Sequence, residues 1–350
     1  MGAPRDKRRP DYSRKHRGVA SFGVLQKENG VYYLQYVLKR ILLMLLTFSI
    51  IVVICFVLVK LLPNQPAEQF GKDMELIMMR REMLGYDKPI VEQFFRFVKQ
   101  AFKGNFGVGE TYKTGNDVWQ VFTSRLPFTI VLNVATMIFS VPLGLLLGIF
   151  AALKKNKWQD HVISTGIMIF VSVPSFIYAF LVQYILYFKL GWTGAIAEVT
   201  KGAWSWMYIK SIIPAILSMS FMTIAGFARY TRAELTEVLT SDFMLLARTK
   251  GLTRSQATVR HAMRNAMVPI FPMILGEFLS IMSGSLIIEQ IFTIPGVGEL
   301  YIGAINAQPA PDYNFFMLLT VFYTFLGLAA GIVIDLSYGI IDPRIRMGAK

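Results

Sequence analysis

Cysteine and histidine are scarce in this chain of 350 residues. The one cysteine, Cys55, lies inside a long apolar run, so a disulfide or a site with several thiolate ligands cannot form within the chain. The three histidines form no H-E-x-x-H pair, and the sequence contains neither a G-x-S-x-G nucleophile elbow nor a G-x-x-x-x-G-K-[ST] phosphate loop. These absences predict a chain that is not an enzyme and holds no cofactor of its own.

Apolar residues, by contrast, are abundant and grouped. They make up 54% of the chain, whose mean hydropathy is +0.48. Six apolar runs are near or above the ~20 residues that cross a bilayer as a helix, although the fourth is short. The predicted fold is therefore an all-α polytopic membrane protein with six transmembrane helices. The six runs are Ile41–Leu62, Leu126–Leu153, Val162–Phe188, Ile212–Ala228, Ala266–Phe292 and Tyr313–Ile341.

The formal net charge of +14 is distributed unevenly between the loops. Residues 1–40 carry ten Lys or Arg and residues 229–266 carry seven, whereas residues 293–312 carry none. By the positive-inside rule, both termini and the 229–266 segment are expected to face the cytoplasm. The basic residues are accordingly interpreted as contacts with anionic lipid, and no nucleic-acid partner is predicted.

These patterns divide the chain into five segments. Within the long outer segment, Pro89 is expected to open an amphipathic helix, and residues 118–122 form a second short amphipathic piece. The segments are 1–40, a basic cytoplasmic tail and lead-in; 41–62, the first transmembrane helix; 63–125, an extracellular segment with amphipathic helices; 126–341, a five-helix core; and 342–350, a cytoplasmic tail.

Prolines and acids inside the apolar runs mark further candidate positions. Pro142 and Pro174 are expected to kink their helices, either as ordinary curvature or as hinges in spans that rock. Three acids lie within runs, and such groups line a cavity or pair internally. Glu277 and Glu289 are candidates for the translocation pathway or for contact with another subunit, with a buried structural bond as the alternative. Asp335 lies within reach of Arg344 or Arg346.

The charged segment from Arg229 to Ala266, called the hairpin below, has the most ordered turn chemistry in the chain. Ser241 or Asp242 can cap a short helix, and Gly251 can end it in a left-handed conformation. Thr253 with Gln256 forms a capping box that starts a further helix. The hairpin is therefore predicted to present a short rigid helix to a partner.

The hairpin resembles the cytoplasmic loop of binding-protein-dependent ABC importer permeases of the oligopeptide, dipeptide and nickel branch. The similarity covers about residues 31–346, with the motifs in family order, and is closest to the first permease subunit of an oligopeptide importer. The motifs are Lys39-Arg-Ile-Leu-Leu-Met-Leu-Leu, Leu61-Leu-Pro-Asn-Gln-Pro-Ala67, Leu84-Gly-Tyr-Asp-Lys-Pro89, Gly104-Asn-Phe-Gly107, Arg125-Leu-Pro-Phe-Thr129, Val173-Pro-Ser-Phe176, Ser241-Asp-Phe-Met-Leu-Leu-Ala-Arg-Thr-Lys-Gly-Leu252, Arg260-His-Ala-Met-Arg-Asn-Ala-Met-Val-Pro269, Ile288-Glu-Gln-Ile-Phe-Thr-Ile-Pro-Gly-Val-Gly298 and Asp335-Leu-Ser-Tyr-Gly-Ile-Ile-Asp-Pro-Arg-Ile-Arg346.

Two departures from the general ABC permease loop favour the peptide branch. That loop has Glu-Ala-Ala, three residues and then Gly, whereas this chain has Leu245, Leu246 and Ala247 before Gly251. Pro269 also comes five residues late. The peptide branch shares both departures, so no role can be assigned to the eponymous glutamate here.

The resemblance implies the type-1 ABC transmembrane fold and a subunit that forms half of the translocation pathway of an ATP-driven oligopeptide importer in the bacterial plasma membrane. The alternatives are a dipeptide or nickel importer and, outside that class, a passive channel. Implied partners are a second homologous permease, two cytosolic ATPases that bind ATP and Mg, an extracellular peptide-binding protein and membrane lipid. The implied coupling residues are Ser241, Asp242, Phe243, Leu246, Ala247, Lys250, Gly251 and Leu252.

Overall fold

The computed structural model describes residues 15–61, 88–283, 285–308 and 310–341, and single positions between 75 and 85. The predictions for residues 1–14, 62–74 and 342–350, including Arg344 and Arg346, lie outside the described residues. The helices are α1 Lys15–Leu61, α3 Ile90–Ala101, α4 Val118–Leu153, α5 Trp158–Ser172, α6 Ser175–Gln183, η2 Tyr184–Lys189, α7 Trp206–Ser211, α8 Ile213–Leu239, α9 Asp242–Thr249, α10 Arg254–Ala257, η3 Thr258–Ala262, α11 Met263–Leu279, η4 Ser280–Met282, α12 Leu286–Ile291, α13 Val297–Ile305 and α14 Tyr313–Ile341.

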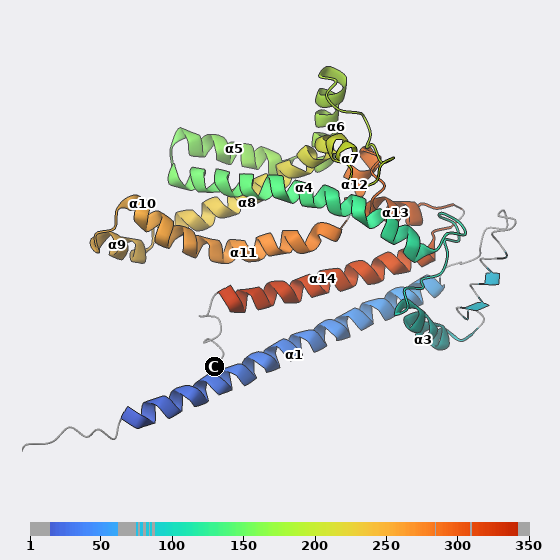
Figure 1. The fold of residues 1–350 in the computed structure, drawn as a ribbon, viewed down its shortest axis with the longest axis horizontal. Helices are drawn as coiled ribbons and strands as arrows, with labels where there is room; N and C mark the ends of the chain where they lie inside the picture. The colour runs from blue at the N-terminus through green and yellow to red at the C-terminus, as the bar shows by residue number, and fades with distance from the viewer. Residues whose placement is uncertain are drawn as a thin grey trace, which may run out of the picture.

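The long helices run roughly along one axis (Figure 1). Helices α9 and α10 lie at one end of this bundle, called the hairpin end, and α12 and α13 lie at the other, called the loop end. Five described helices are long and apolar enough to cross a membrane, and the bent pair α5 and α6 counts as a sixth if it is one span. The predicted polytopic helical fold is confirmed.

The closest helix pair in the bundle is α4 with α8. A Cβ added at Gly144 would come within 2.9 Å of the Ile224 carbonyl oxygen, and one at Gly148 within 2.7 Å of the Ala228 carbonyl oxygen. Glycines four residues apart let two backbones approach, because no side chain separates them. The glycine pair therefore holds α8 directly against α4.

Helices α1 and α14 lie side by side along the other flank (Figure 1). Arg40 Nη1 on α1 lies 2.8 Å from Asp335 Oδ2 on α14. Nearer the loop end, Phe56 of α1 is buried with Tyr313 and Met317 of α14. Asp335 therefore pairs with a residue of another helix, a partner that the sequence interpretation did not name.

Several predicted element ends differ in the structure. The fourth span, α8, runs on to Leu239, so the hairpin begins inside a helix. The fifth ends near Met282, because α12 is a separate short helix. The amphipathic piece at 118–122 is the start of α4, whose helix continues through Pro127 and Pro142. The helix after Pro89 and the sixth span have their predicted positions.

The third span breaks at Pro174. Helices α5 and α6 meet there at 101°, with Val173 extended between them. Proline cannot donate the backbone hydrogen bond that a continuous helix needs, and it disfavours helical geometry in the residue before it. The predicted kink is confirmed at Pro174 and is large enough to turn α6 across the bundle axis (Figure 1).

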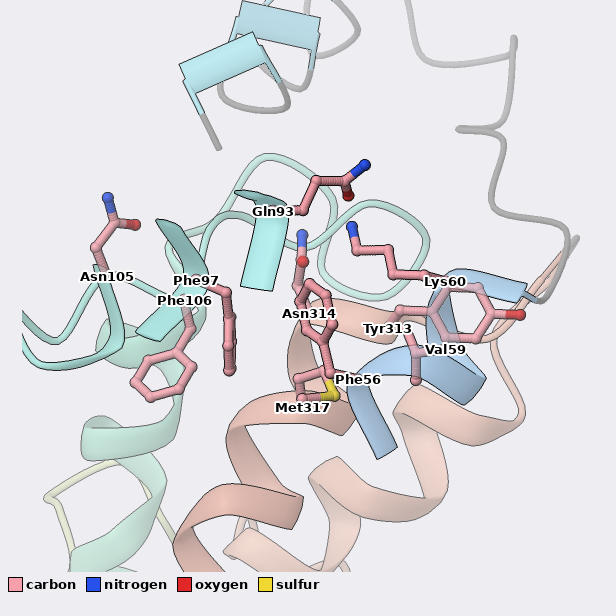
Figure 2. Close-up of a pocket in the computed structure, with 10 residues that line it drawn as sticks. All are labelled: Phe56, Val59, Lys60, Gln93, Phe97, Asn105, Phe106, Tyr313, Asn314 and Met317. Atoms are coloured by element: carbon pink, nitrogen blue, oxygen red, sulfur yellow. The ribbon is translucent and has the colours of Figure 1, made fainter. Parts of the chain in front are cut away.

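A small pocket of about 30 Å³ lies where α1, α3 and α14 meet at the loop end. Figure 2 shows the Lys60, Gln93 and Asn314 side chains above an aromatic base that includes Phe56 and Phe97. This volume holds one or two waters and no peptide. The pocket is therefore a packing feature of the loop end and not a substrate pathway.

Candidate functional site

The hairpin forms a short helix on a tight turn, as the sequence predicted, but its start differs. Ser241 occupies the N-cap position of α9, yet its side chain accepts no hydrogen bond from the helix. Its hydroxyl instead donates to the Val238 carbonyl at 2.6 Å. The capping prediction for Ser241 is wrong in this detail, because the serine closes the end of α8.

The far end of the short helix follows the predicted pattern. Gly251 has φ +89°, a left-handed conformation that glycine adopts without the steric penalty of a Cβ. Thr253 Oγ1 accepts from the Gln256 N–H at 3.3 Å, and the Gln256 side chain accepts from the Thr253 N–H at 3.1 Å. The capping box is confirmed, and it starts α10 in a defined direction.

One face of α9 is buried inside the chain. Met244 and Ala247 keep only 5% and 8% of their surface exposed. They pack on a base of mostly small residues from α4, α8, α10, η3 and α11, with Leu252 at its edge. The base residues are Ala152, Leu235, Ala257, Ala262 and Ala266. Ala247, one of the implied coupling residues, is therefore covered by the chain itself.

The other apolar side chains of α9 are exposed. The side chains of Phe243, Leu245 and Leu246 are 41%, 61% and 55% exposed. Basic residues of α9 and of the segment that follows it are also exposed: Arg248, Lys250, Arg254, Arg260 and Arg264. An apolar patch with a basic rim, held on a rigid turn, has the form of a protein docking surface.

A buried ion pair fixes the helices at the base of the hairpin. Arg232 of α8 donates to both carboxylate oxygens of Asp160 on α5, at 2.5 and 2.8 Å. The Asp160 side chain is 2% exposed and also accepts from the Asn156 N–H at 2.9 Å. The two-pronged geometry matches guanidinium to carboxylate and orders the turn between α4 and α5. Sequence reasoning missed Asp160.

Glu277 lies in the middle of α11 and is half-buried. The Thr223 side chain on the neighbouring α8 lies close enough to interact with its carboxylate. No described cation forms an ion pair with Glu277. A pathway or inter-subunit role for Glu277 stays a prediction.

Glu289 is fully buried at the loop end, outside the fifth span. Its Oε1 accepts from the Thr129 hydroxyl at 2.8 Å, and its Oε2 accepts from the Gly298 and Glu299 N–H groups at 2.8 and 3.3 Å. These groups are called the Glu289 cradle below. A Cβ on Gly296 would come within 2.5 Å of the carboxylate, so only glycine fits there. Both oxygens are used inside the chain, which favours the structural alternative for Glu289.

The cradle joins two motifs that are 160 residues apart. Thr129 ends the motif that begins at Arg125, and Glu289 is the second residue of the motif that ends at Gly298. Arg125 Nη1 also lies 2.5 Å from Glu299 Oε2. The N–H groups at the N-terminus of α13 stabilise the charged form of the Glu289 carboxylate. Burial has the larger effect and raises the pKa of Glu289 to about 7. The cradle thus ties the start of α4 to α12 and α13.

Two family matches together cover most of the chain. Residues 144–347 match the binding-protein-dependent transport system inner membrane component, and residues 33–133 match the N-terminal family of the same systems. The chain belongs to this permease family.

Named relatives agree with this assignment. The chain is 32% identical over 313 residues to the dipeptide transport system permease protein of Lactococcus lactis subsp. cremoris, with 89% of this chain and 99% of that protein covered. It is 31% identical over 316 residues to the glutathione transport system permease protein of Escherichia coli strain K12, with the same shares covered. A methionine ABC transporter structure is similar at a TM-score of 0.49 and 14% identity, over 62% of this chain and 96% of that one.

The permease is thus a multi-pass protein of the bacterial plasma membrane with the type-1 ABC transmembrane fold. Its motifs have structural meanings that the sequence alone did not reveal. The sequence offers one signal for Thr129. It is the hydroxyl residue of its motif, and a buried glutamate in another motif needs such a hydrogen-bond donor. Asp160 offered no comparable signal beyond being an acid in the first turn of an apolar helix.

Proposed function

We propose that this permease forms half of the translocation pathway of an ATP-driven oligopeptide importer and that α9 is its coupling helix. In this arrangement both termini and the hairpin face the cytoplasm, and a second homologous permease completes the pathway. Two ATPase subunits bind ATP and Mg, and an extracellular peptide-binding protein delivers the substrate. Movement of the ATPases is transmitted through α9 to the bundle.

The observation that carries this proposal is the division of α9 into two faces. The buried face joins α9 to α4, α8 and α11 through the small-residue base, so a force on α9 reaches three long helices. The exposed face offers Phe243 and Leu246 as apolar anchors within a basic rim. A passive channel would have no use for this arrangement.

The exposed anchor residues provide the test. Leu246→Asp introduces a charge at a 55% exposed position, so the fold is retained while the apolar contact with the ATPase is lost. We expect substrate-stimulated ATPase activity and peptide uptake to fall at least about ten-fold. Phe102→Asp, at a 90% exposed position of the loop end, is the matched control and leaves both unchanged. Normal uptake by Leu246→Asp at wild-type expression would refute the coupling role.

The second candidate function is dipeptide import, with nickel import a further alternative within the branch. The named relatives are a dipeptide permease and a glutathione permease, which supports a substrate of two or three residues. Competition of labelled-peptide uptake by di-, tetra- and hexapeptides in a deletion strain separates the candidates. Oligopeptide import predicts the strongest competition by the longer peptides, and dipeptide import predicts the reverse. Glu277 is the candidate pathway residue in both cases.

A further inference from the structure

The turn between α4 and α5 combines three lysines with an exposed tryptophan. Lys155 and Lys157 are exposed, Lys154 is half-buried, and Trp158 is 71% exposed. Among the residues that the structure describes, none forms an ion pair with these lysines. This turn is therefore a concentrated positive charge that no ion pair with a described residue compensates.

The shape of the turn is fixed by the buried pair behind it. Asn156 adopts φ +62°, and its N–H is bound by Asp160, whose carboxylate Arg232 holds in place. The Lys157 N–H donates to the Lys154 carbonyl at 2.9 Å, which closes the turn. The lysines are thus presented by an ordered backbone.

The position of the turn matches the edge of a bilayer. The outward side chains that lead to it on both helices are apolar and exposed, as side chains that face lipid would be. They are Leu146, Phe150 and Leu153 on α4 and Val162 and Ile169 on α5, between 44% and 63% exposed. Tryptophan and lysine immediately beyond such a surface occupy the headgroup region, where the indole ring and the long amine stem reach both phases.

The same turn lies short of the region proposed for the ATPase. Helices α9 and α10 extend farther along the bundle axis than the end of α4 and the start of α5 (Figure 1). A partner seated on the tip of the hairpin and a bilayer surrounding the long helices would therefore meet different parts of this end. Depth along the axis separates their binding surfaces.

We propose that Lys154, Lys155, Lys157 and Trp158 form a binding surface for the phosphate headgroups of anionic phospholipids. Its assignment to the cytoplasmic leaflet rests on the orientation in the proposed function; the lipid contact itself does not. The Asp160–Arg232 pair orders this surface, and the lipid in turn holds the hairpin end of α4 and α5 at a fixed depth.

Amine labelling of the wild-type chain in nanodiscs tests this surface without any substitution. Discs of phosphatidylcholine alone are compared with discs that contain phosphatidylglycerol, and acetylation rates are read by peptide mass spectrometry. Anionic lipid is expected to slow acetylation of Lys154, Lys155 and Lys157 about five-fold, with the effect lost in high salt. Lys250, at the tip of the hairpin, is the internal control and reacts equally in both discs.

Further comparisons in the same experiment identify the molecule that protects the lysines. Equal rates in the two discs would overturn the proposal, as would equal protection by inorganic phosphate in phosphatidylcholine discs. Protection that requires the ATPase subunits would also overturn it and would assign the turn to that interface. Loss of coupling at Leu246 is measured separately, so failure of the proposed function leaves this result intact. Trp158→Gln is expected to weaken the lipid protection while keeping the fold, because Trp158 is exposed.

Discussion

The two ends of the bundle are held together by different chemistry. At the hairpin end, α9 rests on alanines, and its contacts are apolar and small. At the loop end, two buried carboxylates bind backbone N–H groups: Glu289 in its cradle, and Asp312, which accepts from Glu110, Thr111 and Tyr112 at 2.6 to 3.0 Å. Hydrogen bonds demand fixed positions, whereas contacts between small residues tolerate shifts. The hairpin end is thus suited to move and the loop end to hold its shape.

The largest effect is expected where the hairpin end departs from this rule, at its one described buried ion pair. Arg232→Ala leaves the Asp160 carboxylate buried without its cation and is expected to lower the free energy of unfolding by about 3 kcal/mol. Thermal unfolding in detergent measures this. The double variant with Asp160→Asn is expected to recover most of the loss. Arg264→Ala, at an exposed position, is the control. If Arg232→Ala lowers the free energy of unfolding no more than Arg264→Ala does, the ion pair does not stabilise the fold.

The second-largest loss of stability is expected at the Glu289 cradle, because there is no space for a side chain at Gly296. Gly296→Ala places a methyl group within 2.5 Å of the Glu289 carboxylate and is expected to lower the free energy of unfolding by about 2 kcal/mol or more. Gly166→Ala is the matched control, since a Cβ there meets nothing within 4 Å. Equal stabilities of the two variants would mean that the loop end yields as readily as the hairpin end.

The pH dependence of stability should differ between the ends because of Glu289. Its pKa is raised by burial to about 7 from an ordinary 4.5, so the folded state binds the proton more tightly. Its contribution to stability is complete below pH 4.5 and is lost as pH rises through 7, by about 3 kcal/mol. Glu289→Gln is expected to remove this part of the profile between about pH 5 and 8. Glu92→Gln, at an exposed position, keeps it. Identical profiles for all three proteins would contradict the burial of Glu289.

The smallest effect is expected at the turn of the hairpin. Gly251→Ala places a Cβ on a residue with φ +89° and open space around it, so only backbone strain of about 1 kcal/mol results. Asn, which tolerates this conformation better, is expected to lower stability less than Ala. Chemical unfolding gives the free energies of unfolding of the Gly251→Ala and Gly251→Asn variants. Equal values would show that the turn adjusts to a Cβ without backbone strain.

Much of the fold could be predicted because spans, prolines and turns are local signals. Long apolar runs predicted the helices, Pro174 the sharp bend, and Gly251 with Thr253 and Gln256 the hairpin turn. Features that depend on contacts between distant segments could not be predicted. The inward face of Ala247 depends on α4 and α8, the cradle joins Thr129 to Glu289, and Asp160 meets Arg232 only after α5 packs on α8. Helical spacing gives the faces of α9 but not which face is covered.

Site-specific cross-linking of α9 tests the central claim most directly. In a chain whose Cys55 is replaced by Ser, a cysteine introduced at Leu246 is combined with a bifunctional thiol reagent in the assembled transporter. We predict a cross-link to the ATPase subunit from Leu246→Cys and none from Gly202→Cys, which lies in the loop between η2 and α7. A cross-link from position 202 and none from position 246 would place the hairpin away from the ATPase and contradict its role in coupling.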